Sequence, residues 1–118
     1  MRQYTTPEQT AKLIDLGFEK PKNERWVLDV ANESTPSIQN LVKRQDYSIG
    51  ELLSFLPKYI KVNGLFFTLC VYPSSGYWVV EYDDIAFGAQ ARLCKDELID
   101  ALFAEIVMIK EEGIMPND

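Results

Sequence analysis

Histidine is absent from this sequence of 118 residues. Its absence removes the commonest general base, the commonest metal ligand and the side chain that titrates near neutral pH. It also excludes a nucleophile activated by histidine, although a serine–lysine pair or a carboxylate mechanism stays open. No phosphate-binding loop, dinucleotide-binding glycine motif or Cys-x-x-Cys pair occurs. We therefore predict no catalytic residue, no cofactor-binding residue, no metal-binding residue and no cofactor.

Cysteine is scarce, and long apolar runs are lacking. Cys70 and Cys94 are too few for a disulfide framework, so we expect two reduced thiols. No segment reaches the roughly 18 consecutive apolar residues that a membrane-spanning helix needs. The first residues lack the apolar core and the small-residue cleavage site of a signal peptide. We therefore expect a cytoplasmic protein with no membrane partner.

Positive charge is sparse in the second half of the chain. Residues 1–62 carry 9 Lys and Arg against 8 Asp and Glu, whereas residues 63–118 carry 3 against 10, for a total charge of −6. A nucleic-acid-binding surface needs clustered positive charge. The small basic groups at residues 20–25 and at Lys43 and Arg44 lie among acids. We therefore expect no nucleic-acid partner, and the acids are too dispersed for a mimic of nucleic acid.

Apolar side chains are plentiful, at 47% of the residues. This fraction suffices for one hydrophobic core and exceeds what a disordered chain contains. The length is typical of one domain, which we expect to span residues 1–118. The pattern described below predicts an α+β fold, in which an antiparallel hairpin or three-stranded sheet packs against a long C-terminal helix and two shorter helices.

Two short helices have clear start signals. Thr6 and Gln9 are spaced as a capping box ahead of the first helix, and Gly17 is placed to end it in a left-handed conformation. Ser48 and Glu51 repeat the capping box ahead of the second helix. Between these helices, residues 25–30 are predicted to form a strand and residues 36–44 a helical turn.

The last helix is predicted to begin after Cys94 as N-cap and to run to about Glu112, with Gly113 ending it. Its apolar face is unusually broad, which leaves a narrow polar stripe that includes Glu97 and Glu105. A helix of this kind should be covered on more than one side. Because Cys94 would lie at the positive end of the helix dipole, we expect it to be the more reactive thiol.

The segment LFFTLCVYPSSGYWVVEYDD, residues 65–84, predicts a hairpin with residues 73–76 as its loop. This loop pairs Tyr72 with Tyr77. One face is then almost purely apolar and should face the core; its residues are Leu65, Phe67, Leu69, Val71, Trp78 and Val80. Residues 85–93 are predicted to form either a third strand or an irregular crossing, with Gly88 at a bulge or close approach.

The outer face of this hairpin carries three aromatics, namely Phe66, Tyr72 and Tyr77. Either another segment of the chain covers them, or they form a patch that binds a partner. Glu81 and Asp83 alternate onto the same face, and Asp84 marks the strand end. We interpret these carboxylates as a solvated strand end, with a metal or catalytic site as the alternative.

The stretches YSIGELLSFLPKYI and ELIDALFAEIVMIKEEGI, with a tryptophan-containing strand between them, resemble a group of short uncharacterised proteins encoded by phages and mobile elements of gut Bacteroides and their relatives. The opening QTAKLIDLGFEKP adds to the likeness. The resemblance covers most of the chain from Tyr47 onward, and its motifs are structural. It implies an origin and a compartment, and it assigns no role to any residue.

Two functions follow as hypotheses. The first is a non-enzymatic protein-interaction module with an unknown protein partner, able to associate weakly with itself as a homodimer. It depends on the aromatic outer face and on the broad apolar helix. The second is a small-molecule-binding protein or small enzyme that uses carboxylate and tyrosine side chains, which a deep pocket with converging polar groups would favour.

Overall fold

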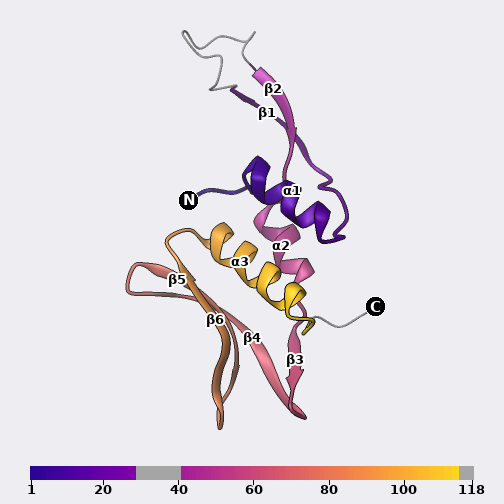
Figure 1. Cartoon of the computed structure of the whole chain (residues 1–118). Coiled ribbons are helices and arrows are strands. Elements are labelled where there is room, and N and C mark those ends of the chain that lie inside the picture. The colour runs from indigo at the N-terminus through magenta and orange to yellow at the C-terminus, as the bar shows by residue number, and fades with distance from the viewer. Residues whose placement is uncertain (29–40, 115–118) are drawn as a thin grey trace.

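The computed structural model describes residues 1–28 and 41–114. These residues form three helices and two antiparallel sheets, which confirms the expected α+β class (Figure 1). In chain order the elements are α1 (Pro7–Asp15), β1 (Glu24–Leu28), β2 (Leu41–Gln45), α2 (Ile49–Phe55), β3 (Tyr59–Val62), β4 (Leu65–Ser74), β5 (Tyr77–Asp84), β6 (Gly88–Lys95) and α3 (Leu98–Glu111).

The larger sheet has four strands in the order β3, β4, β5, β6, and all neighbours are antiparallel. The sequence predicted the hairpin of β4 and β5 and allowed β6, but it did not predict β3. The turn into β4 is Asn63-Gly64, and both residues have positive φ, at 51° and 82°. Asn-Gly between two apolar runs is a strong hairpin signal, so a local pattern for β3 was present.

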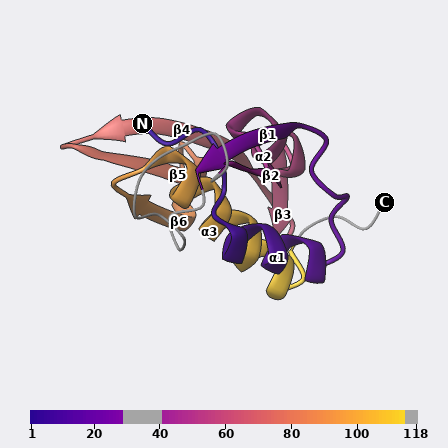
Figure 2. The same ribbon diagram turned by 90° about the horizontal axis from the view of Figure 1, so that it is seen from above.

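Helix α3 lies between the sheet and the other two helices (Figure 1). Seen from above, α1 lies beside α3 (Figure 2), and Lys12 of α1 forms an ion pair with Glu111 of α3 at 3.8 Å between Nζ and Oε2. The predicted cover on more than one side of this helix is therefore confirmed. None of the helices in the described ranges is long and apolar enough to cross a membrane.

Strands β1 and β2 form a separate two-stranded ribbon that projects from the helices (Figure 1). Its register runs from Glu24 opposite Gln45 to Leu28 opposite Leu41. The predicted helical turn over residues 36–44 is wrong for residues 41–44, which are extended; residues 36–40 lie outside the described part. Pairing with β1 satisfies the backbone groups along one edge of each strand, and this outweighs a weak local preference for a helical turn.

The predicted helix caps of α1 and α2 are confirmed. The Gln9 backbone N–H donates to the Thr6 hydroxyl oxygen at 3.1 Å, and the Thr6 N–H donates to the Gln9 side chain at 3.0 Å. Ser48 and Glu51 form the same reciprocal pair at the start of α2. Gly17 follows α1 with a φ of 97°, a left-handed conformation that glycine adopts without a steric penalty.

The predicted start of the last helix is wrong. Cys94 lies in β6, and the N-cap of α3 is Glu97, whose side chain makes no capping hydrogen bond. Pairing between β5 and β6 continues to Trp78 opposite Lys95, so the ladder includes Cys94. The helix ends at Glu111, close to the predicted boundary, and Gly113 follows with a φ of 72°.

The hairpin of β4 and β5 has a tighter turn than the sequence predicted. Ser74 pairs with Tyr77 around a two-residue turn in which Ser75 and Gly76 both have positive φ. Tyr72 therefore lies opposite Val79 and not opposite Tyr77. Because the register differs by two residues, every side chain keeps its predicted face.

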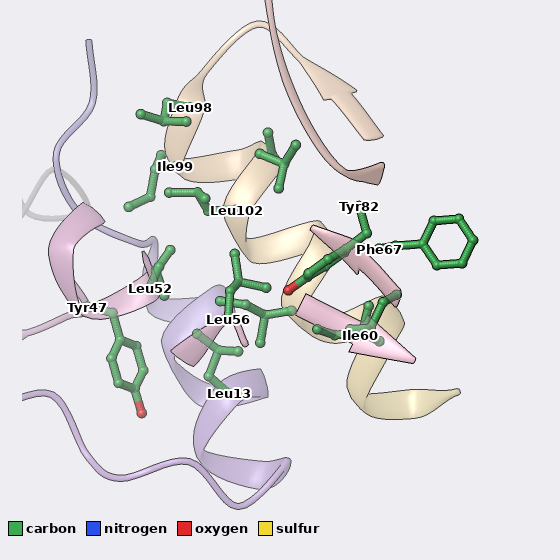
Figure 3. Packing of buried hydrophobic residues seen from close by; sticks show 14 residues of the cluster. Leu13, Tyr47, Leu52, Leu56, Ile60, Phe67, Tyr82, Leu98, Ile99 and Leu102 are labelled. Atoms are coloured by element: carbon green, nitrogen blue, oxygen red, sulfur yellow. The ribbon is translucent and has the colours of Figure 1, made fainter. Parts of the chain in front are cut away.

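The core lies between the inner face of the sheet and the three helices (Figure 3). Leu52 of α2 and Leu102 of α3 meet there, and both are fully buried. Phe67, Val80 and Tyr82 supply the buried side chains of the inner sheet face. Leu69, Val71 and Trp78 pack against this cluster as half-buried residues. The predicted core face of the hairpin is thus confirmed, except that Leu65 is exposed at the strand end.

Candidate functional site

Glu81, in the middle of β5, is a buried acid on the outer face of the sheet. Its side chain is 3% exposed, so the interpretation of this carboxylate as solvated is wrong. The Tyr72 hydroxyl of β4 donates a hydrogen bond to Glu81 Oε1. That bond, with burial, raises the pKa of Tyr72, while the positive charge of Arg92 opposes part of the rise. Side chains from the two neighbouring strands, Glu81 of β5 and Arg92 of β6, therefore act on the Tyr72 hydroxyl.

A bulge in β6 lies opposite Glu81. The register shifts between Val80, which pairs with Leu93, and Tyr82, which pairs with Gln90. Ala91 within the bulge has a φ of 53°, an uncommon conformation for a residue with a Cβ atom. A bulge re-aims side chains and increases the local twist. The prediction that Gly88 marks a bulge or a close approach is wrong: Gly88 pairs regularly with Asp84, no described residue would lie within 4 Å of a Cβ atom there, and the bulge lies at Ala91.

Glu105 of α3 is a second buried acid, and it is fully inaccessible to solvent. Neither carboxyl oxygen has a hydrogen-bond partner among the described residues. Burial, together with the negative charge of Glu81, raises its pKa to about 8. The prediction that Glu105 belongs to a polar stripe is wrong, because its side chain is fully buried; α3 packs against β5, β6 and α2.

Tyr82 of β5 lies near the same acid and is fully buried. Its hydroxyl donates to the Pro57 carbonyl oxygen at 2.7 Å, so the phenol has a partner of its own. Burial and the proximity of Glu105 raise the pKa of Tyr82. The phenol therefore stays protonated at neutral pH and ties β5 to the segment between α2 and β3.

Asp46, at the base of the ribbon, is a third buried acid and is fully partnered. Its carboxylate accepts hydrogen bonds from the Thr10 hydroxyl at 2.6 Å, from Arg44 Nη2 at 2.9 Å and from Arg25 Nη2 at 3.2 Å. The Arg25 guanidinium also lies over the ring of Tyr4, 4.3 Å from its centroid. These contacts anchor both ribbon strands to α1 and to the N-terminal segment.

The two thiols differ in their surroundings. Cys70 is half-buried on β4, and burial with the nearby negative charges of Asp83 and Glu81 raises its pKa. Cys94 is exposed on β6. The higher reactivity of Cys94 stays a prediction, now for a different reason: exposure, and not the dipole of α3, distinguishes it.

The pKa shifts around the sheet mostly favour protonated side chains. Tyr72, Tyr82, Cys70 and Glu105 all have raised pKa values. A phenolate or thiolate nucleophile requires the opposite shift. Glu105, with a pKa of about 8, is the one of the four that titrates near neutral pH. Within residues 1–28 and 41–114, no group of three or more acid and cysteine side chains is arranged to hold a metal ion.

The three predicted patch residues share the outer sheet face but lie apart along it. Tyr77 is 51% exposed beside the β4–β5 turn. Tyr72 is half-buried and bonded to Glu81. Phe66 is 57% exposed near the opposite end of β4, where it pairs with Lys61. The structure therefore separates Phe66 from the other two by several residues of strand.

Phe66 belongs to a different group of exposed side chains at the end of the sheet that carries the β3–β4 and β5–β6 turns (Figure 1). Its ring packs edge-on against Tyr59 at 5.6 Å between centroids, and Lys61 Nζ lies 5.6 Å from the Phe66 ring centre. We call this group the turn-end surface; its apolar members are Tyr59, Leu65, Phe66, Ile85 and Phe87.

Asp84 shapes the β5–β6 turn that presents Ile85 and Phe87. Its carboxylate accepts the backbone N–H groups of Ala86 at 2.7 Å and Phe87 at 3.1 Å. Asp84 is the last residue of β5, so its predicted position at the strand end is confirmed. No motif in the sequence distinguishes Tyr59, Ile85 or Phe87. The available signal was a large apolar residue next to a turn, which also occurs in covered turns.

Comparison with known proteins found no matching family model, no matching curated protein and no matching solved structure.

Proposed function

We propose that this protein is a non-enzymatic protein-interaction module of phage or mobile-element origin. The sequence resemblance described above supports the origin. The turn-end surface supports the interaction role. Eleven large apolar side chains are exposed among the described residues, and five of them belong to this one end of the sheet.

The apolar side chains at this end are strongly exposed. Ile85 is fully exposed, and Tyr59, Phe66 and Phe87 are each 57–59% exposed. Apolar surface in water is unfavourable, and contiguous exposed patches in soluble proteins often mark binding sites. Tyrosine and other aromatic side chains are also enriched at protein–protein interfaces. A binding role explains why these residues are not polar.

Self-association is one form that this role can take. The predicted basis in the C-terminal helix is weakened, because the apolar side chains of α3 are buried or packed against the core. A weak homodimer would then use the outer face of the sheet. Sedimentation velocity at several protein concentrations tests this: a single monomeric species up to high micromolar protein would exclude the dimer.

The module itself is tested by affinity capture from a bacterial host lysate. Tagged protein and the tag alone are compared by quantitative mass spectrometry, and each enriched protein is purified and titrated against the module by calorimetry. We expect at least one saturable binary interaction with a stoichiometry near one. If no purified candidate binds, the interaction role is wrong.

A second candidate function, binding or conversion of a small molecule, is favoured by Glu105. A buried carboxyl group that has no hydrogen-bond partner among the described residues and a pKa near 8 is typical of functional sites. A thermal-shift screen of small amines and polar metabolites compares wild type with Glu105→Gln. A compound that stabilises wild type alone would support this function, whereas equal or absent shifts would favour a purely structural Glu105.

A further inference from the structure

We infer that α3 contains a proton-controlled hinge: loss of the Glu105 proton releases the C-terminal half of this helix from its neighbours, while the N-terminal end of the helix stays in place. The inference goes beyond the proposed function and does not depend on it. It is carried by the surroundings of the Glu105 carboxyl group and by the unequal anchoring of the two ends of α3.

The Glu105 carboxyl group fits the closed structure only as the neutral acid. It is fully inaccessible to solvent, and neither of its oxygens has a hydrogen-bond partner among the described residues. A buried carboxylate without such partners is far more costly than a buried neutral acid. An ionised Glu105 therefore requires water, and water reaches it only if the contact between α3 and its neighbours opens.

The strand β5 offers the ionised acid no compensation. α3 packs against β5, β6 and α2. From β5, Glu81 is a second buried acid, and its negative charge opposes ionisation of Glu105. The Tyr82 hydroxyl, also from β5, already donates to the Pro57 carbonyl oxygen at 2.7 Å. Both groups on this strand therefore favour the neutral acid.

The other two elements that pack against α3 supply no partner either. The charged residues of β6 are Arg92 and Lys95; both are exposed, and the charge of Lys95 acts on Asp100 at the start of α3. The charged residue of α2 is Glu51, which is engaged in the capping box of that helix. Ionisation of Glu105 would therefore leave a buried negative charge unpaired within the described part of the chain.

The N-terminal end of α3 is firmly anchored. Arg2 Nη2 forms an ion pair with Asp100 Oδ1 at 2.5 Å, and Gln9 Nε2 donates to the same oxygen at 2.8 Å. The Arg2 backbone N–H donates to Glu97 Oε1 at 3.1 Å. Only residues 96–97 separate this end of the helix from β6. These contacts make the N-terminal end the fixed point of the hinge.

The C-terminal end of α3 has weaker polar contacts. Lys12 Nζ of α1 lies 3.8 Å from Glu111 Oε2, and both side chains are about half exposed. Lys110 Nζ lies 5.5 Å from the centre of the Phe18 ring. An exposed ion pair contributes little to stability. Apolar packing therefore provides most of the hold on this half of the helix, and local openings occur where the hold is weakest.

The proton links this hinge to pH. In the open form Glu105 should titrate near its ordinary value of 4.5, whereas burial raises its pKa in the closed form to about 8. Between these values, opening releases one proton. The equilibrium constant for opening should therefore rise about tenfold per pH unit over this interval and level off above it.

The test is thiol labelling at the two ends of α3. In a background of Cys70→Ser and Cys94→Ser, Ile109→Cys reports on the C-terminal half and Ile99→Cys on the N-terminal end; both isoleucines are fully buried. Labelling rates from pH 6 to 8 are divided by those of the same variant unfolded in urea at the same pH, which removes the titration of the thiol itself. Circular dichroism checks folding, and Ile106→Cys, at another fully buried position, replaces Ile109→Cys if that variant is unfolded.

We expect the normalised labelling of Ile109→Cys to accelerate about 100-fold from pH 6 to pH 8. It should be about tenfold faster than labelling of Ile99→Cys at each pH, and insensitive to low concentrations of urea, because a local opening exposes little surface. Adding Glu105→Gln should abolish the acceleration. Adding Glu81→Gln should reduce it, because removing the charge of Glu81 lowers the pKa of Glu105 in the closed form.

Three results would overturn the inference. An acceleration that persists with Glu105→Gln would assign the pH dependence to another group. Equal labelling at Ile99→Cys and Ile109→Cys, with a steep dependence on urea, would show that the whole domain unfolds and that no hinge exists. Labelling of Ile109→Cys that does not accelerate with pH would show that Glu105 ionises without opening the helix.

Discussion

Three buried acids lie in three regions of this protein and have different numbers of partners. At the ribbon base, Asp46 accepts hydrogen bonds from Thr10, Arg25 and Arg44. On the outer sheet face, Glu81 accepts one side-chain hydrogen bond, from Tyr72. Between α3 and the sheet, Glu105 accepts none among the described residues.

The comparison shows how burial and partners act in opposite directions. Burial disfavours the charged form of an acid, and hydrogen bonds or positive charges restore it. Glu105 has burial without compensation, and its pKa rises to about 8. We expect Glu105 to be tolerated in the folded protein as a neutral group, whereas Asp46 and Glu81 contribute hydrogen bonds to the fold.

The largest expected effect is the pH dependence that Glu105 imposes. Its pKa is about 8 in the folded protein and near 4.5 in the unfolded chain, so between these values the folded state holds a proton that the unfolded state has lost. Stability should therefore fall as pH rises from 4.5 to 8, by on the order of 4 kcal/mol, and level off above. Urea denaturation at stepped pH measures it.

Glu105→Gln is the matched control, because the amide keeps the shape of the acid and does not titrate. Its stability should vary less over the same pH interval, and the difference between the two curves isolates the contribution of Glu105. Parallel curves for wild type and variant would show that Glu105 is solvated in the folded protein.

Asp46→Ala should produce the next largest effect, a loss of about 3 kcal/mol at pH 7. The substitution leaves the guanidinium groups of Arg25 and Arg44 without their shared carboxylate, and both are only about one-third exposed. Chemical denaturation measures the loss. As a control, Glu24→Ala removes the exposed ion pair with Lys43 on the same ribbon and should cost less than about 1 kcal/mol. Equal losses of stability in Asp46→Ala and Glu24→Ala would contradict the prediction that the buried carboxylate contributes more than the exposed ion pair.

Glu105→Leu should stabilise the protein at pH 7, by about 2 kcal/mol, because it removes a buried polar group that has no hydrogen-bond partner in the described part of the chain. Replacing an acid that has hydrogen-bond partners by leucine should instead destabilise the protein. The sign of the change in stability therefore tests the comparison between the buried acids. The denaturation midpoint at constant m-value gives the answer. A destabilised Glu105→Leu would mean that the carboxyl group has a partner in solution.

Tyr72→Phe should have the smallest effect, a loss of about 1 kcal/mol, because it removes one hydrogen bond between side chains, the bond from the Tyr72 hydroxyl to Glu81. Differential scanning calorimetry measures it, with Tyr77→Phe as the control at an exposed tyrosine. No change in Tyr72→Phe would mean that water replaces the phenol, which would make Glu81 more accessible than its 3% exposure indicates.

Much of the fold could be predicted from the sequence. The capping boxes at Thr6 and Ser48 were recognised because each depends on two residues three positions apart. The inner face of the hairpin was recognised because the side-chain period of a strand is two. The turn at Ser75-Gly76 was predicted to be two residues longer than it is. The predicted faces are still correct, because a register error of two residues leaves every side chain on the same face.

The candidate site was harder to predict. Phe66 was selected for its face, but its neighbour Tyr59 comes from a strand whose position depends on its pairing with β4. Cys94 was placed at a helix start because its spacing from Glu97 mimics a capping box, and the β5–β6 ladder excluded it. The spacing between two residues in the sequence cannot show that pairing with a neighbouring strand continues through them.

The sequence by itself determined where α1 and α2 begin, which residues of the hairpin face inward, and that α3 needs cover on several sides. These features arise from interactions within one turn or one strand. Only the tertiary structure decided that Glu81 and Glu105 are buried, that Asp46 joins the ribbon to α1, and that five apolar side chains stay exposed at one end of the sheet. Burial and partners are set by segments far apart in the chain, and no local pattern contains them.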